Sequence, residues 1–360
     1  MRRTPWAACA LIVTLTVGGC SSTAPQSGST ATPDASIGTL RIGTGLTPET
    51  RHAAYIYEAA LEGAGYSVDV VETDPNRPSY FESMGIDPTS TAPPEATGTA
   101  PASDLVHITP DLSGDLLLYL TDNGKLSPTI IEGRREAAAA SATSTVTSDT
   151  TTNPLPSPSA TGLNVRGLSS NDIVSYVDRA LPGTVELLNP SSATDRYGYV
   201  ITQATAASHQ LTTMSDLGSV CGELGLVAPA NYDTNLSGAS SLSDHYGCTP
   251  GAVRTVEGRD EQTEQLITGQ TELAYMYSAS AQISANNLLL LDDPEGTQLA
   301  QNIVPVTRAG ELPQQVKDII NDVSADLDTD SLVRLNTLTS GDNPVSETDA
   351  AYFWLTTMRG

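Results

Sequence analysis

Two tyrosines stand two positions apart in the segment TELAYMYSAS, residues 271 to 280. Residues i and i+2 of an extended strand share a face, so the rings of Tyr275 and Tyr277 are expected on one side. A tyrosine ring can attract a cation to its face, or it can simply pack with its hydroxyl hydrogen-bonded. The chain has 13 tyrosines but only 2 phenylalanines and 2 tryptophans. Residue content alone favours packing.

A second candidate is the turn in RIGTGLTP, residues 41 to 48, which carries Thr44 and Gly45. Backbone N–H groups between a strand and a helix can receive an anionic group, and such turns line the ligand crevice of open α/β sheets. The third glycine of a dinucleotide fingerprint is missing, because Pro48 stands in its place. We therefore expect a tight turn or a crevice wall here, and not a nucleotide site.

Motifs for catalysis or metal binding are missing from the sequence. It contains no phosphate-binding loop, no G-x-S-x-G, no H-E-x-x-H and no paired C-x-x-C. The histidines share no metal-ligand spacing and are interpreted as packing or surface residues; they are His52, His107, His209 and His245. The sequence predicts no enzyme activity, no cofactor and no metal.

The elements that position these residues alternate between strands and helices. TLRIGT, a helix begun by Pro48 and YSVDVVET form strand, helix, strand, the opening of a parallel sheet. A strand in DLVHIT, a helix in DLLLYLTDNG and a helix capped by Ser169 and Asp172 follow. Further strands are expected in TVELLNP, YGYVIT, LGLVAP, VRTVE and ELAYMY, with helices near 203–208, 238–246 and 259–269 and three helices after 312.

The charge balance excludes one class of partner. The chain has 17 basic and 42 acidic residues, for a formal net charge of −25. Such a surface repels phosphate backbones, so no nucleic acid is expected to bind.

The N-terminus has the pattern of a secretory signal over residues 1–19. Arg2 and Arg3 precede an apolar run, and small residues lead to Cys20. The sequence VGGC resembles a bacterial lipobox, in which the cysteine carries lipid; the alternative is a plain signal peptide cut near Gly19. We expect a lipid anchor at Cys20 on the extracytoplasmic face of a bacterial cell membrane, with residues 20–37 as a flexible tether.

The four cysteines predict one disulfide. Cys9 leaves with the signal and Cys20 is assigned to lipid. In an oxidising compartment Cys221 and Cys248 then pair with each other. Two free buried thiols are the alternative.

Two segments, 85–104 and 137–162, contain few large apolar residues. They are predicted to be disordered surface insertions.

Two long segments carry a family resemblance. They are LLLLDDPEGTQLAQNIVPVTR (288–308) and DTDSLVRLNTLTSGDNPVSETDAAYFWL (328–355). With the lipobox, the tether and the strand-helix-strand opening, they resemble the substrate-binding lipoproteins of ABC importers, in the branch for glycine betaine, choline and carnitine. The resemblance covers most of residues 39–357 apart from the insertions.

The resemblance implies an α/β fold of the two-lobe periplasmic-binding-protein type II, with a ligand cleft between lobes joined by two crossover strands. Lobe I is expected over 38–192 and 280–360, and lobe II over 193–279. Ligand binding would close the lobes, and a membrane permease would recognise the closed form. A monomer is expected.

Three of the family's site motifs can be placed on this chain. Its Asn-Thr-Tyr stands at Asp195, Arg196 and Tyr197; its Tyr-Ser-Thr-Asp-Gly begins at Tyr277; its Glu-Tyr-Thr-Gly-Thr stands at 111–115. The resemblance thus implies that the rings of Tyr197 and Tyr277 wall a cage around a quaternary ammonium, each contributing about 0.5–2 kcal/mol. Tyr275 extends the cage or packs between strands.

The chain departs from the family pattern at several of these positions. Leu112, next to Ser113, replaces an aromatic wall. Asp195 could pair with a cationic head group and Arg196 with a carboxylate, or the two could neutralise each other.

The leading functional prediction is a receptor that delivers a compatible solute to an ABC permease. The alternative is an envelope lipoprotein that keeps the scaffold but acts by docking or regulation, as the altered cage and the insertions would suit.

Overall fold

The computed structural model describes residues 38–74, 76–88, 104–143, 162–341 and 343–359, with the backbone alone for 137–143. The predicted signal peptide, the lipidated Cys20 and the tether lie outside the described residues. So do residues 89–103 and 144–161, which make up most of the two predicted insertions.

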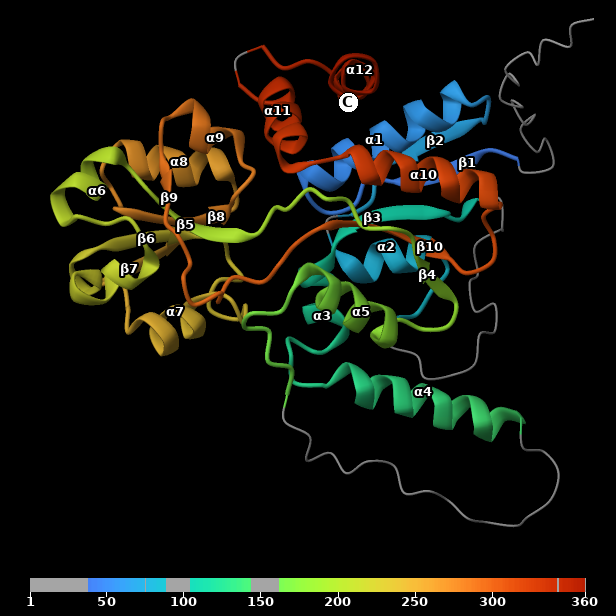
Figure 1. Cartoon of the computed structure of the whole chain (residues 1–360), viewed down its shortest axis with the longest axis horizontal. Helices are drawn as coiled ribbons and strands as arrows, with labels where there is room; N and C mark the ends of the chain where they lie inside the picture. The colour runs from blue at the N-terminus through green and yellow to red at the C-terminus, as the bar shows by residue number, and fades with distance from the viewer. Residues whose placement is uncertain (1–37, 75, 89–103, 144–161, 342, 360) are drawn as a thin grey trace, which may run out of the picture.

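Two five-stranded sheets organise the chain into two lobes (Figure 1). The first sheet holds β1 (Leu40–Gly43), β2 (Val68–Val71), β3 (Ile108–Leu112), β4 (Val185–Leu187) and β10 (Ile303–Arg308). Their order is β2-β1-β3-β10-β4. β1 runs parallel to β2 and β3, whereas β10 is antiparallel to β3 and β4.

The second sheet repeats this arrangement. It holds β5 (Tyr197–Ile201), β6 (Gly225–Ala228), β7 (Ala252–Thr255), β8 (Leu273–Tyr277) and β9 (Leu289–Leu290) in the order β7-β6-β8-β5-β9. β6 is parallel to β7 and β8, and β5 is antiparallel to β8 and β9. The predicted two-lobe α/β architecture is confirmed.

Two connections join the lobes, 188–196 and 291–302, and each feeds the antiparallel strand of the sheet that it enters. The expected return to lobe I at residue 280 comes too early. β9 pairs with β5 through Ile201 and Leu289, so residues up to Leu290 remain with the second sheet. The reason is that β5 has a free edge, which β9 covers before the chain crosses back.

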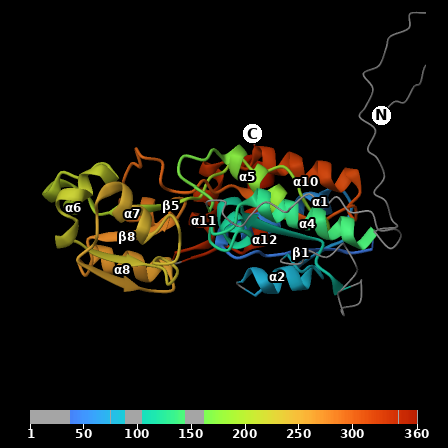
Figure 2. The same cartoon turned by 90° about the horizontal axis from the view of Figure 1, so that it is seen from below.

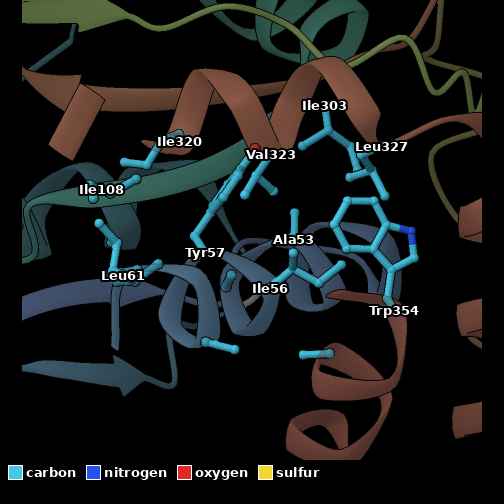
Figure 3. Close-up of a cluster of buried hydrophobic side chains, with 14 of the residues drawn as sticks. Ala53, Ile56, Tyr57, Leu61, Ile108, Ile303, Ile320, Val323, Leu327 and Trp354 are labelled. Atoms are coloured by element: carbon cyan, nitrogen blue, oxygen red, sulfur yellow. The ribbon is translucent and has the colours of Figure 1, made fainter. Parts of the chain in front are cut away.

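Helices cover both faces of the first sheet, as parallel strands require. One face carries the core of Figure 3, in which Trp354, Tyr57 and Ile320 are fully buried. The other face packs residues such as Phe81, Leu117 and Val177. The helices of this lobe are α1 (Pro48–Gly63), α2 (Arg77–Ser83), α3 (Ser113–Leu120), α4 (Pro128–Thr143), α5 (Ser170–Ala180), α10 (Gln314–Asp326), α11 (Thr329–Thr339) and α12 (Glu347–Phe353), before a last turn at Trp354–Met358.

The second lobe is smaller and is cross-linked. Its helices are α6 (Gln203–His209), α7 (Ala239–Tyr246), α8 (Arg259–Ile267) and α9 (Ala281–Ala285). The predicted disulfide between Cys221 and Cys248 is confirmed, with the Cα atoms 5.3 Å apart. Figure 2 shows this lobe beside the first, with the connections between them.

Local sequence explains several element ends. The predicted capping box at α5 is present, because the Ser169 side chain accepts from the Asp172 N–H and the Asp172 side chain accepts in return. The second predicted insertion, however, starts too early, since α4 runs to Thr143. The alanines at 137–140 are the best helix formers, which explains this extension. Within the described residues no helix is long and apolar enough to cross a membrane.

Candidate functional site

Three tyrosine rings form a stack where β5 and β8 meet the junction of the lobes. Tyr197 and Tyr277 are cross-strand partners, as are Tyr199 and Tyr275. The ring centroids of Tyr275 and Tyr197 are 4.6 Å apart, and those of Tyr197 and Tyr277 are 3.9 Å apart. We call Tyr275, Tyr197 and Tyr277 the tyrosine column. Rings at these separations touch each other, so no methyl group can lie between them.

The column is also closed along its edges. The Tyr275 hydroxyl is 3.1 Å from the Ser237 carbonyl oxygen, to which it donates, and the Tyr277 hydroxyl donates to Asp115 Oδ2 at 2.8 Å. Burial, followed by the charge of Asp115, raises the pKa of Tyr277 well above its usual value, so the phenol stays a donor. The hollow beside Tyr197, also lined by Gln301, is too small to admit a water molecule.

The outer face of the column carries a cation from the chain itself. The guanidinium carbon of Arg259, in the first turn of α8, lies 5.0 Å from the centroid of the Tyr277 ring. The guanidinium also binds Glu49 of α1 through two hydrogen bonds, with Nη2 2.9 Å from Oε2. Glu49 has no exposed side-chain surface, and Arg259 has 18%. This ion pair therefore joins the lobes in a desolvated setting, where it interacts more strongly than at the surface.

Asp195 completes what we call the ion cluster, defined as Glu49, Asp195 and Arg259. Its Oδ1 accepts from the Ala279 N–H at 2.7 Å, and its Oδ2 lies 3.9 Å from Arg259 Nη2. Burial raises the pKa of Asp195 well above its usual range, and the charge of Glu49 adds to this. A protonated Asp195 can donate to Glu49, which gives Oδ2 the partner that it otherwise lacks among the described residues.

Glu49 keeps the negative charge of the cluster. Burial acts to raise its pKa, but the charge and hydrogen bonds of Arg259 outweigh burial and lower the pKa to about 2. Asn336 of α11 supports the carboxylate by donating from Nδ2 to Oε1 at 2.8 Å and to the Ala279 carbonyl at 2.7 Å. His52 Nε2 lies 2.9 Å from Asn336 Oδ1 and fixes that amide. Glu49 is thus held by hydrogen bonds from both lobes.

A cleft of about 660 Å³ opens on the other side of the junction. Side chains from both lobes line it. Those of lobe I come from α2, α3, the α3–α4 connection and α4, and those of lobe II from the segment after β6. They include Arg77, Asp115, Leu118, Tyr119, Asp122, Asn123, Ile131, Arg134 and Arg135 of lobe I, and Asn231, Thr234 and Asn235 of lobe II.

The carboxylate at the inner end of this cleft is held in place from several directions. The N–H of Asp115 donates to Gln301 Oε1 at 2.9 Å, and Gln301 Nε2 donates back to Asp115 Oδ1 at 2.6 Å. Gly114 permits this approach, because a Cβ there would lie 2.6 Å from the Ala300 carbonyl oxygen. Asp115 of α3 is thereby fixed against Gln301 of the second connection, and it is half-buried, with lone pairs left for a ligand.

Arg77 supplies a positive group beside this carboxylate. Its Nε and Nη2 donate to Asp111 at 2.9 and 2.6 Å, and Tyr80 donates to the same carboxylate at 2.7 Å. The Arg77 side chain also lines the cleft and is 16% exposed. The cleft thus presents carboxylates and guanidinium groups together, with Asp115 and Arg77 among them, a pattern that suits a dipolar solute.

The predicted site residues separate into two groups. Tyr197, Tyr275, Tyr277 and Asp195 do lie together, although the rings enclose no open cage. Arg196 is exposed, and no ion pair joins it to Asp195 among the described residues.

The other predicted positions are buried away from the cleft. Leu112 lies in the core of lobe I, and Ser113 exchanges hydrogen bonds with Asn302. Thr44 is buried, and Gly45 has a φ of +74° in a turn closed by Thr50. The structure favours the tight-turn alternative for this segment.

Sequence reasoning missed Arg259, Glu49, Arg77 and Tyr119, and it placed Asp115 in a family motif at 111–115 without assigning a role to it. One weak signal existed, since Glu49 and Asp115 are acidic residues in the first turns of helices that follow strands. No cluster of potential metal ligands occurs in the part of the chain that the structure describes.

Solved structures with the same fold include transport proteins. A structure described as a glycine betaine/carnitine/choline ABC transporter has a TM-score of 0.63 at 15% identity, covering 88% of this chain and 97% of that one. Apo YehZ from Escherichia coli has a TM-score of 0.55 at 17% identity, covering 89% and 98%. A search of curated proteins gives no match. These likenesses confirm the two-lobe periplasmic-binding-protein fold.

The sequence matches a protein family, which supports a more specific assignment than the fold alone. Residues 38–357 match a family described as the substrate binding domain of ABC-type glycine betaine transport system. The match spans both lobes, both connections and the closing helices. This chain therefore belongs to the family of substrate-binding domains of ABC-type glycine betaine transport systems.

Proposed function

We propose that this chain is a lipid-anchored extracytoplasmic receptor that binds a small quaternary amine, of the glycine betaine, choline or carnitine type, and delivers it to an ABC permease. The observation that carries the proposal is the cleft, in which Asp115 and Arg77 of one lobe face Asn231 and Asn235 of the other. Its volume of about 660 Å³ lies in the usual range of small-molecule sites.

The chemistry of the cleft fits a zwitterion better than a simple cation. A quaternary ammonium donates no conventional hydrogen bond and is held by charge and by ring faces, here Asp115 and Tyr119. Arg77 lines the same cleft, and its guanidinium would bind a carboxylate, which glycine betaine and carnitine have and choline lacks. We therefore expect betaines to bind more tightly than choline.

Delivery would follow from closure. Because both lobes line the cleft, a bound solute would stabilise the closed arrangement, and the permease would recognise that arrangement. The receptor would act as a monomer, attached by lipid at Cys20, with residues 20–37 as its tether. Mass spectrometry of the mature N-terminus should find a diacylglyceryl group on Cys20, and an unmodified cysteine would refute the anchor.

Calorimetry tests the ligand assignment. The mature chain is titrated with glycine betaine, carnitine, choline, ectoine and proline. Asp115→Asn should weaken the binding of betaines at least tenfold, because it removes the charge that faces the ammonium. Asp122→Asn is the matched control, since this carboxylate lines the same cleft but is 65% exposed and pairs with Lys125. Failure of the wild-type chain to bind any of these solutes at millimolar concentration would refute the assignment.

A second function is favoured by one observation, the ion cluster, which joins the lobes without any solute. A chain closed in this way could act as a docking or regulatory lipoprotein of the envelope. Pull-down of an envelope complex from cells that lack importer subunits would support this alternative, and permease and ATPase genes beside this gene would support import.

A further inference from the structure

The tyrosine column ends at an aromatic face that carries the chain's own cation. The column runs from Tyr275 through Tyr197 to Tyr277, and the next group in line is the guanidinium of Arg259 at 5.0 Å. Ring face, carboxylate and exclusion of water are the three elements of a site for a quaternary ammonium. All three are present around Arg259, because Tyr277 supplies the face, the fully buried Glu49 supplies the charge, and the partly buried position of Tyr277 limits the access of water.

We propose that Arg259 is a specificity-determining residue, a built-in cation that occupies the place where a cationic head group would otherwise bind the tyrosine column. The inference rests on the proposed function, since it concerns where this receptor accepts an amine. It predicts that the column rejects amines in the wild-type chain, and that a second cation site exists beneath Arg259.

The contacts of Arg259 are those of a fixed group. Its two hydrogen bonds to Glu49 hold the guanidinium plane, and Asp195 Oδ2 faces Nη2 at 3.9 Å. Asn336 donates to Glu49 from the far side. Because two hydrogen bonds hold the Arg259 guanidinium on the Glu49 carboxylate, a free amine cannot bind that carboxylate. The closed arrangement therefore excludes cations from this side.

The position is reachable from solvent. A cavity of about 210 Å³ is lined by Arg259 together with Pro48, Gln282 and Asn336. It lies between α1, α9 and α11, on the side of the junction opposite the cleft. Truncation of Arg259 would extend this cavity to the ring of Tyr277 and the carboxylate of Glu49.

Tetramethylammonium is the probe, because it has the head group of the proposed ligands without a carboxylate or a hydroxyl. We expect Arg259→Ala to bind it with a dissociation constant at least tenfold lower than that of the wild-type chain, by calorimetry on the full mature protein. Arg259→Lys keeps a cation on the ring and should gain nothing. Arg254→Ala removes an exposed arginine of the same lobe and is the matched control.

A further pair of variants separates this inference from the proposed function. Tetramethylammonium is titrated into Asp115→Asn and into Asp115→Asn/Arg259→Ala. Binding by the double variant alone supports the inference even if the cleft binds no solute. If Asp115→Asn loses betaine binding but the double variant gains no affinity for tetramethylammonium, the cleft remains the binding site and the inference is overturned.

The test remains decisive if Arg259→Ala is unstable. Arg259→Gln can still donate to Glu49 and is neutral, so it should fold and also gain affinity. Tetramethylammonium should raise the melting temperature of the folded variant and leave that of the wild-type chain unchanged, since a ligand stabilises only the state that it binds. A folded, neutral variant that shows neither response contradicts the proposal.

Discussion

Each side of the lobe junction places a carboxylate of lobe I beside an arginine, but the consequence differs between the two sides. On one side a helix of lobe I brings Glu49 in its first turn to an arginine, and on the other side α3 brings Asp115 in the same way. The arginine that meets Glu49 comes from lobe II, whereas Arg77 beside Asp115 comes from lobe I and is occupied by Asp111. Lobe II offers Asp115 only a phenol and uncharged amides. The source of the countercharge thus decides whether a carboxylate closes the lobes or remains available to a solute.

The carboxylates on the two sides of the junction also differ in burial. Glu49 has no exposed side-chain surface, so its charge must be balanced within the protein. Asp115 is half-buried at the wall of a cleft of about 660 Å³, where a solute or water can balance its charge. The ion cluster should therefore dominate stability, and the cleft should dominate affinity.

The largest expected effect is on stability, from Glu49→Ala. This change leaves Arg259 largely buried without its partner and should lower the free energy of unfolding by about 3–5 kcal/mol. Ionisation of Asp195, 3.9 Å away, would keep the loss near the lower end. Urea unfolding measures the change. Glu72→Ala is the control, because its ion pair with Arg51 is exposed, at 64% and 36%, and should contribute under about 1 kcal/mol. Equal losses in the two variants would remove the distinction between the sides.

The pH dependence of stability should carry the signature of Glu49. Its pKa is about 2 in the folded chain, below the unfolded value of 4.5, so the unfolded chain takes up the proton first as pH falls. Its contribution is present above about pH 5 and is lost toward pH 2, on the order of 3 kcal/mol. Urea unfolding from pH 6 to pH 2 should show a shallower fall for Glu49→Gln than for the wild-type chain.

Asp195 should change the pH dependence of stability in the opposite direction to Glu49. Its pKa is raised in the folded chain, so the folded state loses stability relative to the unfolded state as pH rises from about 4. In Asp195→Asn that loss should disappear, and the variant should gain on the wild-type chain with increasing pH. A difference that does not change with pH would mean that Asp195 is ionised in the folded chain.

The cleft side should respond to Tyr119→Leu mainly in affinity. The change removes a ring face but keeps apolar bulk, so the affinity for a quaternary amine should fall about tenfold, or about 1.4 kcal/mol, with little change in stability. Tyr176→Leu is the control, because its ring faces Arg179 on α5 and is not among the residues that line the cleft. Unchanged affinity in Tyr119→Leu would place the amine elsewhere.

The sequence predicted the fold well where the signals are local. The strands at 40–43 and 197–201, and the cap of α5 at Ser169, follow from alternation and capping within a few residues. The boundary at residue 280 failed, because the pairing of β9 with β5 joins segments that are distant in the sequence. The failure at 137–143 has another cause, since low complexity was given more weight than the helix propensity of alanine.

The site was predicted less well, for a physical reason. The pair of Tyr197 and Tyr277 could be placed from motifs, but what covers them could not. Arg259 lies 210 residues from Glu49, and Asp115 lies 162 residues from Tyr277. No local sequence pattern indicates which residue of the other lobe a charged side chain will contact. Such pairs can be identified only from the folded structure.

Tyr277 touches both sides of the junction, and its hydroxyl allows the smallest and sharpest test. Its ring lies against Arg259, and its hydroxyl donates to Asp115 Oδ2 at 2.8 Å. Tyr277→Phe keeps the ring and removes the hydrogen bond, so stability should fall by about 1 kcal/mol. The carboxylate of Asp115, freed of this donor, should then bind a quaternary amine in the cleft two- to threefold more tightly. Calorimetry and urea unfolding measure the two effects on one protein.

Tyr275→Phe is the control, because the Tyr275 hydroxyl binds Ser237 and not Asp115. This variant should lose similar stability without any gain in affinity. Should both variants change affinity alike, the hydroxyl of Tyr277 would have no special access to the cleft, and the two sides of the junction would not be coupled through this residue.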